Sequence, residues 1–303
     1  MRIAVFPGQG SQSPGFLAPW LAVEGARERL AQYSEWSGVD LLAAGTEWDA
    51  DRIRDTQVAQ PLIVAASLLS WNALPGRERI DGVAGHSVGE FAAAAAAGVL
   101  TEQAALSLVG TRGRAMAEAA AAADTGMSAV IGGDEATVLA RLEELELAPA
   151  NYNGGGQLVV AGTAEGLRAL AAEPPTGTRV IPLQVAGAFH TRYMAPAVEK
   201  LRAAAGAAAA SDPTVTLWTN SDGAAVTSGV AFVELLVNQV ASPVRWDLCM
   251  ASFADAGIDG LVELTPAGTL TGLAKRALRG IPAVAVKTPD DLDAAAALLA
   301  ADV

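Results

Sequence analysis

Cysteine and histidine, the residues that most often build disulfides and transition-metal sites, are scarce in this sequence. Its 303 residues include one cysteine and two histidines. One cysteine cannot form a disulfide within the chain, and so few thiol and imidazole groups argue against a zinc site. Cys249 lies in the apolar stretch 246–250, which is typical of a packed helix, so we interpret it as a buried, unreactive thiol. We expect no bound metal.

Basic clusters and long apolar runs are also missing. Lysine and arginine total 20 against 33 aspartate and glutamate residues, so the formal net charge is -13, and no basic run offsets it locally. Such a charge repels nucleic acid and anionic membranes. The longest apolar stretches, at 91–100 and 203–210, are too short to span a bilayer, and the N-terminus lacks the features of a secretory signal. The alanine tract 203–210 has plain helix composition, so we expect it to be helical. We expect a cytoplasmic protein that binds neither nucleic acid nor membrane.

The overall composition is typical of a folded, globular chain. Hydrophobic residues make up 51% and charged residues 17%, which is globular rather than disordered. A chain of this length can form one large α/β domain with a smaller insertion, or two modest domains.

Strand, turn and helix signals alternate along the first part of the chain. The apolar run 2–6 predicts a buried strand, and the glycine-containing segment 7–12 predicts a sharp loop after it. A second strand is expected at 80–84. Helices are expected at 91–97 and over 102–123, where strong helix formers place apolar residues at helical spacing. Strands that feed turns and helices indicate α/β topology.

The pattern changes at about residue 124 to shorter elements. They are expected as strand 127–131, helix 135–145, strands 148–152 and 158–161, helix 164–171 and strand 178–184. This βαββαβ order is typical of a ferredoxin-like unit with antiparallel pairing. Strands separated by helices resume at 215–219, 260–264 and 283–286. We therefore predict an α/β protein with a large domain over 1–123 and 188–303 and an inserted α+β subdomain over 124–187.

One turn has the pattern of a nucleophile elbow. Residues 85–89 fit G-x-S-x-G, with Ser87 between an expected strand and an expected helix. The glycines let neighbouring backbone come close, and the helix N-terminus offers N–H donors and a positive dipole to an oxyanion. The alternative interpretation is a βα turn bounded by glycines whose serine has no catalytic role.

A serine nucleophile needs a base, and only His86 and His190 can serve as a histidine base. His86 adjoins Ser87 within a tight turn, where neighbouring side chains point apart, so it is the poorer candidate. His190 follows a strand near the expected subdomain boundary, where clefts commonly form. A hydrogen-bonded structural histidine remains the alternative for His190.

Several short motifs together resemble the malonyl-CoA:acyl carrier protein transacylase family along nearly the whole chain. They are Pro7-Gly8-Gln9-Gly10-Ser11-Gln12, Ala59-Gln60-Pro61, Gly85-His86-Ser87-Val88-Gly89-Glu90, Arg112-Gly113, Asn151-Tyr152-Asn153 and Gly187-Ala188-Phe189-His190. Each motif is common alone, but the order and spacing are specific. The resemblance implies an α/β-hydrolase-like large domain with a parallel central sheet and an inserted ferredoxin-like subdomain.

The resemblance also implies catalytic roles. Ser87 would attack the thioester and His190 would accept its proton. The backbone N–H groups of Gln9 and Val88 would form the oxyanion hole. In this family a backbone carbonyl orients the histidine, and the matching residue is Gln239, so no triad acid is implied. The residues alone leave Asp222, Asp247 and Glu263 as possible acids.

Substrate-binding residues follow from the same resemblance. Arg112 would grip the free carboxylate of a malonyl group with two hydrogen bonds, although an exposed helical arginine is the alternative. Phe189 would disfavour a branched α-carbon and so select malonyl over methylmalonyl. Gln60 and Asn153 would line the pocket as polar groups; a helix cap and a hairpin turn are their alternatives.

The reaction implied is ping-pong transfer through a malonyl-Ser87 intermediate. Malonyl-CoA and acyl carrier protein would be the partners, CoA thioester would be a substrate, and no cofactor would be needed. The pathway, fatty acid or polyketide synthesis, stays open, and we expect a monomer. Carriers are typically acidic, and Lys275, Arg276 and Arg279 are candidates for a local basic patch, or simply a solvated helix end.

Three other functions remain as alternatives. Residues 8–13 nearly fit the dinucleotide-binding pattern G-x-G-x-x-G, but serine replaces the third glycine and Pro14 and Pro19 interrupt the helix that should follow. A hydrolase with the same elbow would usually carry its base near the C-terminus after an acid, whereas His190 lies mid-chain. A catalytically inactive interaction module is the third.

Overall fold

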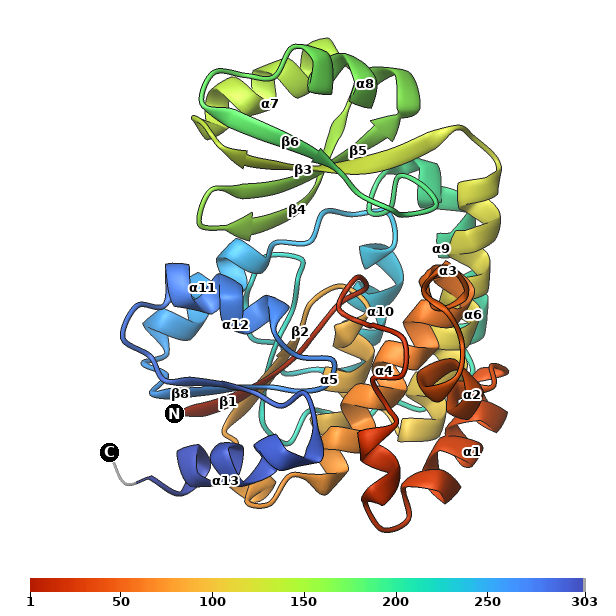
Figure 1. Cartoon of the computed structure of the whole chain (residues 1–303), viewed down its shortest axis with the longest axis vertical. Coiled ribbons are helices and arrows are strands. Elements are labelled where there is room, and N and C mark those ends of the chain that lie inside the picture. Colours follow the sequence, from red (N-terminus) through yellow and green to blue (C-terminus); the bar gives the residue numbers. More distant parts are fainter. Residues whose placement is uncertain (302–303) are drawn as a thin grey trace.

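Two separate sheets organise the chain, which a computed structural model describes over residues 1–301 (Figure 1). The first is a five-stranded parallel sheet with the order β7-β2-β1-β8-β9. Its strands are β1 (Arg2–Phe6), β2 (Gly82–Gly85), β7 (Thr216–Trp218), β8 (Gly260–Glu263) and β9 (Ala283–Ala285). The expected α/β class with a parallel central sheet is therefore confirmed.

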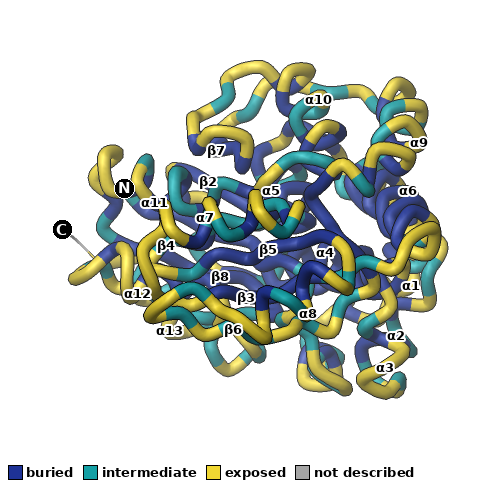
Figure 2. Tube along the Cα trace, turned by 90° about the horizontal axis from the view of Figure 1, so that it is seen from above, coloured by how far each residue is buried: buried dark blue, intermediate teal, exposed yellow. Residues whose placement is uncertain are grey.

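Both faces of the parallel sheet are covered. Side chains alternate along β1, so that Ile3 and Val5 pack with the helices on one face while Ala4 and Phe6 join the larger core on the other. Helices α11 (Trp246–Asp255) and α12 (Thr269–Ala277) pack on the face where Ile3 and Val5 lie. Strands β1, β2 and β8 are buried at every residue, whereas β9 at the edge of the sheet is partly exposed (Figure 2). A strand buried on both faces explains why the sequence at 3–6 is continuously apolar.

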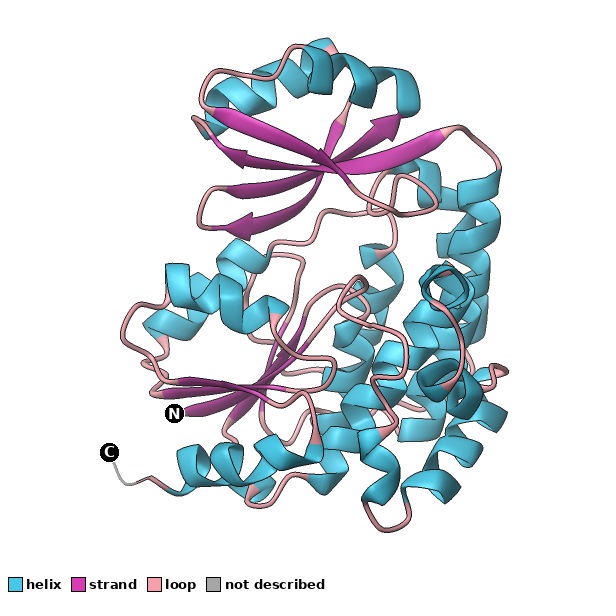
Figure 3. Ribbon diagram, in the orientation of Figure 1, coloured by secondary structure: helices cyan, strands magenta, loops and turns pink. Residues whose placement is uncertain are grey.

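Most of the remaining helices gather on the other face (Figure 3). They are α1 (Ala26–Ser37), α2 (Leu41–Thr46), α3 (Ala50–Arg54), α4 (Thr56–Ala73), α5 (Gly89–Ala96), α6 (Glu102–Ala121), α9 (Ala195–Ala205), α10 (Gly229–Gln239) and α13 (Leu292–Ala300). Short 3-10 turns cover Pro19–Ala22, Arg77–Arg79, Arg192–Met194 and Pro289–Asp291. Within residues 1–301, none of the helices is both long and apolar enough to cross a membrane.

The second sheet is antiparallel, with the order β4-β5-β3-β6. It comprises β3 (Thr125–Gly132), β4 (Ala148–Gly154), β5 (Gln157–Thr163) and β6 (Thr178–Pro182), with α7 (Glu135–Glu144) and α8 (Ala164–Ala172) between the strands in sequence. Figure 1 shows both helices on the side away from the parallel sheet. The expected βαββαβ order of elements is confirmed.

The antiparallel sheet is joined to the large part of the molecule by backbone hydrogen bonds at its edge strand, β4. Tyr152 donates its N–H to the carbonyl of Val244 at 2.9 Å, and Val244 donates to the carbonyl of Ala150 at 2.8 Å. Helix α6 leads into β3 and so links the two sheets along the chain (Figure 1), and Arg112 lies in the middle of this helix. The space between the sheets is where the candidate site lies.

One expectation about a helix is wrong. The alanine tract 203–210 was expected to be helical, but α9 ends at Ala205 and residues 207–210 are outside any helix. Gly206 is the C-cap residue, and the high helix propensity of the alanines after it does not extend the helix, because propensity is a weak signal that the surrounding structure overrides.

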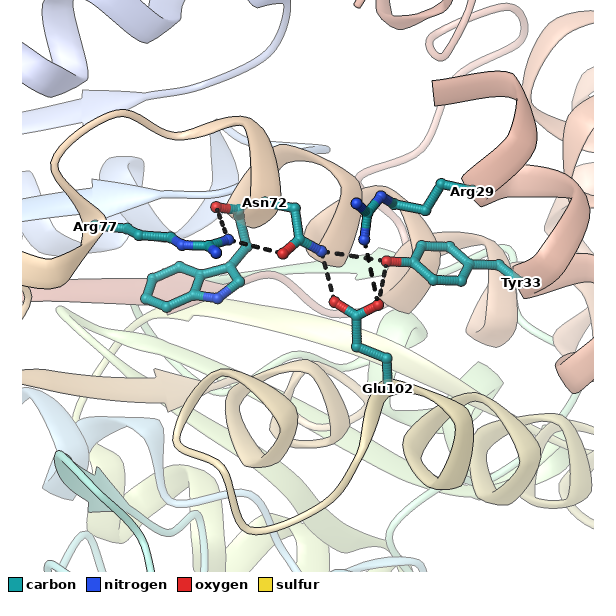
Figure 4. Close-up of polar contacts among 6 residues, drawn as sticks. Arg29, Tyr33, Asn72, Arg77 and Glu102 are labelled. Atoms are coloured by element: carbon teal, nitrogen blue, oxygen red, sulfur yellow. Dashed lines mark hydrogen bonds and ion pairs between the residues drawn. The ribbon is translucent and has the colours of Figure 1, made fainter. Parts of the chain in front are cut away.

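A carboxylate joins three of the helices at the outer end of α6 (Figure 4). Glu102 accepts hydrogen bonds from the Tyr33 hydroxyl on α1 at 2.7 Å and from the Asn72 amide on α4 at 2.5 Å. Arg77 in turn donates to Asn72 at 2.7 Å, and Arg29 lies 3.6 Å from Glu102. Burial and the Glu102 charge raise the pKa of Tyr33, so its hydroxyl stays a donor. We call these five residues the Glu102 cluster.

Candidate active site

The turn between β2 and α5 holds Ser87 in a conformation that only its glycine neighbours permit. Ser87 has φ 52°, in the left-handed region. A Cβ on Gly85 would lie 2.0 Å from the backbone of Gly89, and a Cβ on Gly89 would lie 2.2 Å from the carbonyl oxygen of Phe6. Because both positions exclude side chains, α5 packs directly against the end of β1 and presents Ser87 at the edge of the sheet.

His190 lies against this serine although 103 residues separate them in sequence. The distance from Ser87 Oγ to His190 Nε2 is 2.7 Å. The ring is 4% exposed, and its Nδ1 donates to the backbone carbonyl of Gln239 at 2.8 Å. With Nδ1 protonated, Nε2 is the atom that can accept the serine proton.

None of the three acids that the sequence left open bonds to Nδ1 of His190; each has another partner. Asp247 pairs with Arg245 at 2.8 Å. Glu263 accepts from the N–H groups at the start of α12, and Asp222 accepts from its own turn. The imidazole is therefore oriented by a neutral group.

The electrostatics keep His190 uncharged. Burial and the positive charge of Arg112 lower its pKa from the usual 6.5 to about 3. A base with this pKa is free of its proton at neutral pH and is ready to accept one from Ser87.

Arg112 is a buried cation beside the nucleophile. It is 1% exposed; Nη1 donates to Gln60 Oε1 at 2.7 Å and Nη2 donates to Gln239 Oε1 at 2.8 Å. Nη2 also lies 3.4 Å from Ser87 Oγ, and Nε has no hydrogen-bond partner within the described chain. Burial lowers the pKa of the guanidinium to about 10, so it remains charged at neutral pH. A buried cation held only by neutral amides is a site for an anionic group.

The cavity at Ser87 brings together most of the residues expected from the sequence. Its lining is Gln9, Gln60, His86, Ser87, Val88, Arg112, Met116, Met127, Asn151, Val159, Leu183, Val185, Phe189 and His190. The N–H groups of Gln9 and Val88 have no acceptor among residues 1–301, as two oxyanion donors would require. Asn153 lies in the adjoining cavity instead, and its Oδ1 is 2.9 Å from His86 Nε2. Gln239 lies behind His190.

Sequence reasoning missed residues on both sides of this cavity. Met116 lines it and accepts a hydrogen bond from Gln60 Nε2 at 3.4 Å, which turns the Gln60 oxygen toward Arg112. Behind Ser87, the fully buried Asn220 accepts the Ser87 N–H at 2.7 Å. Two of these residues had a local signal: Glu90 follows Ser87 in the same motif, and Met116 lies one helical turn after Arg112. Asn220 had none. Burial raises the pKa of Glu90 to about 8, while the donors of Asn220 and Gln239 act against the rise.

Other groups have local explanations. Cys249 is fully buried, and burial raises the pKa of its thiol, in agreement with the expected unreactive residue. The structure shows no group of three or more metal-ligating side chains within residues 1–301.

The sequence matches the acyl transferase domain family over residues 4–294. It is 53% identical over 291 residues to a malonyl CoA-acyl carrier protein transacylase of Mycobacterium tuberculosis, covering 95% of this chain and 96% of that protein. The crystal structure of MCAT from Mycobacterium tuberculosis superposes with a TM-score of 0.94 at 52% identity, covering 98% of this chain and 100% of that one. A malonyl-transacylase solved in complex with a type II PKS acyl-carrier protein gives a TM-score of 0.89 at 32% identity, covering 97% and 98%.

Proposed function

The chain belongs to the acyl transferase domain family, and from that premise we propose that it transfers a malonyl group from malonyl-CoA to the phosphopantetheine thiol of an acyl carrier protein. The observation that carries the malonyl assignment is Arg112. Its buried guanidinium lies 3.4 Å from Ser87 Oγ. Within residues 1–301, its Nε has no hydrogen-bond partner and no acidic side chain bonds to the guanidinium. The free carboxylate of a malonyl group would supply that anion.

The first half-reaction uses the Ser87–His190 pair. Ser87 Oγ attacks the thioester carbonyl while its proton passes to His190 Nε2. The oxyanion that forms is stabilised by the N–H groups of Gln9 and Val88. When the carbon–sulfur bond breaks, the CoA sulfur takes the proton from His190, which leaves a malonyl ester on Ser87 and free CoA.

The second half-reaction repeats these steps with a different thiol. His190 accepts the proton of the carrier's pantetheine thiol, whose sulfur attacks the Ser87 ester. The oxyanion collapses, Ser87 recovers its proton and malonyl-carrier leaves. The transfer needs no metal or redox cofactor, because the thioester already holds an activated acyl group.

The lining residues have roles that follow from their positions. Gln239 orients the base through its carbonyl and Arg112 through its side chain. Gln60 holds the other side of the guanidinium, and Phe189 fills the space beside the base where a branched α-carbon would have to fit. We assign Asn153 to the adjoining part of the substrate channel, since it lies with Gln9 in the neighbouring cavity.

We further propose an α/β-hydrolase-like domain over 1–123 and 188–303 and a ferredoxin-like subdomain over 124–187. The two separate sheets and the antiparallel order β4-β5-β3-β6 support this division. We propose a cytoplasmic monomer that supplies malonyl units to fatty acid or polyketide synthesis.

Intact-mass analysis after exposure to malonyl-CoA tests the function. We expect a malonyl adduct on the wild-type protein that persists until acyl carrier protein is added, and none on Ser87→Ala. Prompt conversion to free malonate without a carrier would indicate a hydrolase. Retention of NAD or FAD without an adduct would indicate the dinucleotide-binding alternative.

A further inference from the structure

A buried carboxylate lies behind the serine and histidine and has no part in the reaction as described. Glu90 is 1% exposed and lies in the first turn of α5, shortly after Ser87. Its Oε1 accepts a hydrogen bond from the backbone N–H of Asn220 at 2.6 Å, and its Oε2 accepts one from Nε2 of Gln239. Removing a carboxylate from water is costly unless donors surround it, so a specific task would explain its place here.

The amide of Gln239 connects this carboxylate to Arg112. Its Nε2 faces acceptors, the Glu90 carboxylate and the carbonyl of Ser87 at 3.0 Å. Its Oε1 faces a donor, Nη2 of Arg112 at 2.8 Å. Because an amide has one accepting and one donating end, acceptors on the Nε2 side oblige the oxygen to face the guanidinium. Glu90 thereby anchors Arg112 through a single intervening side chain.

The same carboxylate also supports the nucleophile's turn. Asn220, which donates its N–H to Glu90, accepts the Ser87 N–H with Oδ1 at 2.7 Å and donates Nδ2 to the Gly85 carbonyl at 2.7 Å. These bonds hold the backbone that leads into Ser87, the residue with φ 52°. One carboxylate is thus bonded to the supports of both the nucleophile and the cation.

We propose that Glu90 is a positioning residue that sets the malonyl selectivity of the site by fixing Gln239 and, through it, Arg112. This inference rests on the proposed function, since selectivity here means the fit of a malonyl carboxylate to the guanidinium. Glu90 acts through Gln239 and does not touch the substrate.

The variant Glu90→Gln tests the inference with almost no change of shape. Its amide brings an NH2 group against one of the two donors, Asn220 N–H or Gln239 Nε2. If Gln239 turns over to accept from that NH2, its own Nε2 then faces Arg112, donor against donor. We expect malonyl loading to slow by about 100-fold and acetyl loading by much less, because a displaced guanidinium loses its fit to a carboxylate that only the malonyl group carries. Intact-mass time courses with malonyl-CoA and acetyl-CoA give both rates; they are run at about pH 9, above the Glu90 pKa of about 8, so that the wild-type group is a carboxylate.

A matched control comes from the Glu102 cluster (Figure 4). Glu102 also accepts from several donors, but it lies at the start of α6, outside the cavity at Ser87. Glu102→Gln should lower the melting temperature and leave the malonyl-to-acetyl ratio unchanged. A general loss of stability would therefore not reproduce the effect expected of Glu90→Gln.

A double-mutant cycle tests the path of the effect. Gln239→Met removes the amide but keeps the backbone carbonyl that holds His190, so it should lower the same ratio. If Glu90 acts through Gln239, the double variant should lose no more selectivity than the larger single loss. Losses that add, or an unchanged ratio in Glu90→Gln, would overturn the inference.

The inference stays testable if Glu90→Gln does not fold, and its failure can be told apart from failure of the proposed function. If Glu90→Gln does not fold, Glu90→Asp keeps the charge but withdraws the carboxylate by one methylene, and a wild-type ratio in that variant would overturn the inference. A wild-type protein that forms no malonyl adduct contradicts the proposed function itself. A wild-type adduct together with unchanged selectivity in the Glu90 variants contradicts the positioning role alone.

Discussion

At the scale of single residues, the chemistry depends on how the environment alters ordinary side chains. Arg112 stays charged although it is buried with only neutral hydrogen-bond acceptors, the amides of Gln60 and Gln239 and the Ser87 hydroxyl. His190 is kept neutral by burial and by that same charge. The cation therefore has two effects: it offers a binding site for a carboxylate, and it disfavours protonation of His190. Two predictions follow these two effects.

Arg112→Ala should reduce malonyl loading by roughly 10- to 100-fold, the equivalent of hydrogen bonds to a charged group. Acetyl loading should fall far less, because an acetyl group has no carboxylate. Arg114→Ala, which changes an exposed arginine of the same helix, is the matched control and should affect neither rate. Equal losses for malonyl and acetyl in Arg112→Ala would remove Arg112 from the carboxylate role.

The pH dependence of acetyl loading should report the pKa of His190. The base is active above its pKa and is lost as the pH falls through it, so the wild type should show no inflection near 6.5. In Arg112→Ala the neighbouring charge is gone, the pKa of His190 rises, and the acid limb should move to higher pH. Rates measured between about pH 4 and about pH 8 decide this. A wild-type inflection at the usual histidine pKa would show that His190 is not shifted as described.

At the scale of elements, the strand–turn–helix unit that carries Ser87 is held by close contact between backbones. Gly85 and Gly89 leave no room for a side chain between the end of β1 and the start of α5. This contact places the N–H of Val88, at the start of the helix, beside the loop that carries Gln9. The geometry of the oxyanion site is therefore set by the packing of β1 against α5.

Gly89→Ala should impair both stability and chemistry. The new methyl group would meet the carbonyl oxygen of Phe6, and such overpacking costs about 1–3 kcal/mol. Acylation should fall more than tenfold because the two N–H groups move apart. Thermal unfolding and malonyl loading are the measurements.

The matched control is Gly272→Ala in α12, where an added methyl would meet nothing within 4 Å. It should be neutral or stabilise by up to about 1 kcal/mol through helix propensity. Wild-type loading in Gly89→Ala would contradict the account of the turn.

At the scale of the whole molecule, the site lies between two sheets and the chain is strongly acidic. A net charge of -13 repels an acidic carrier protein, so an approach to Ser87 needs a local positive region. Lys275, Arg276 and Arg279 are exposed at the end of α12, and the start of that helix lines the cavity next to Ser87. This arrangement makes α12 a candidate route for the carrier.

Lys275→Glu with Arg276→Glu should slow transfer to acyl carrier protein by about tenfold at low ionic strength and leave loading from malonyl-CoA nearly unchanged. The control is Arg27→Glu with Arg168→Glu, which makes the same change in net charge at exposed positions on α1 and α8. Stopped-flow or quenched mass measurements at two salt concentrations separate the two half-reactions. Equal effects from both double variants would mean that only the net charge matters.

Much of this architecture was predictable because its signals are local. The apolar run of β1, the alternation of strands and helices, and the glycines around Ser87 each depend on neighbouring residues, and the parallel sheet followed from them. The end of α9 was missed since the alanines of 203–210 have high propensity whether or not a helix is continued. The boundaries of the two domains stay a prediction.

The sequence by itself indicated the nucleophile turn, since the glycines at 85 and 89 and the flanking strand and helix are all local signals. Only the tertiary structure decided what meets that serine. His190 is 103 residues away, Asn220 is 133 and Gln239 is 152 from it, and side chains so far apart in sequence come together only when packing closes the chain between them. The same packing placed the buried carboxylate of Glu90 behind Gln239. No spacing in the sequence could indicate that link, because a hydrogen-bonded network depends on distances in space.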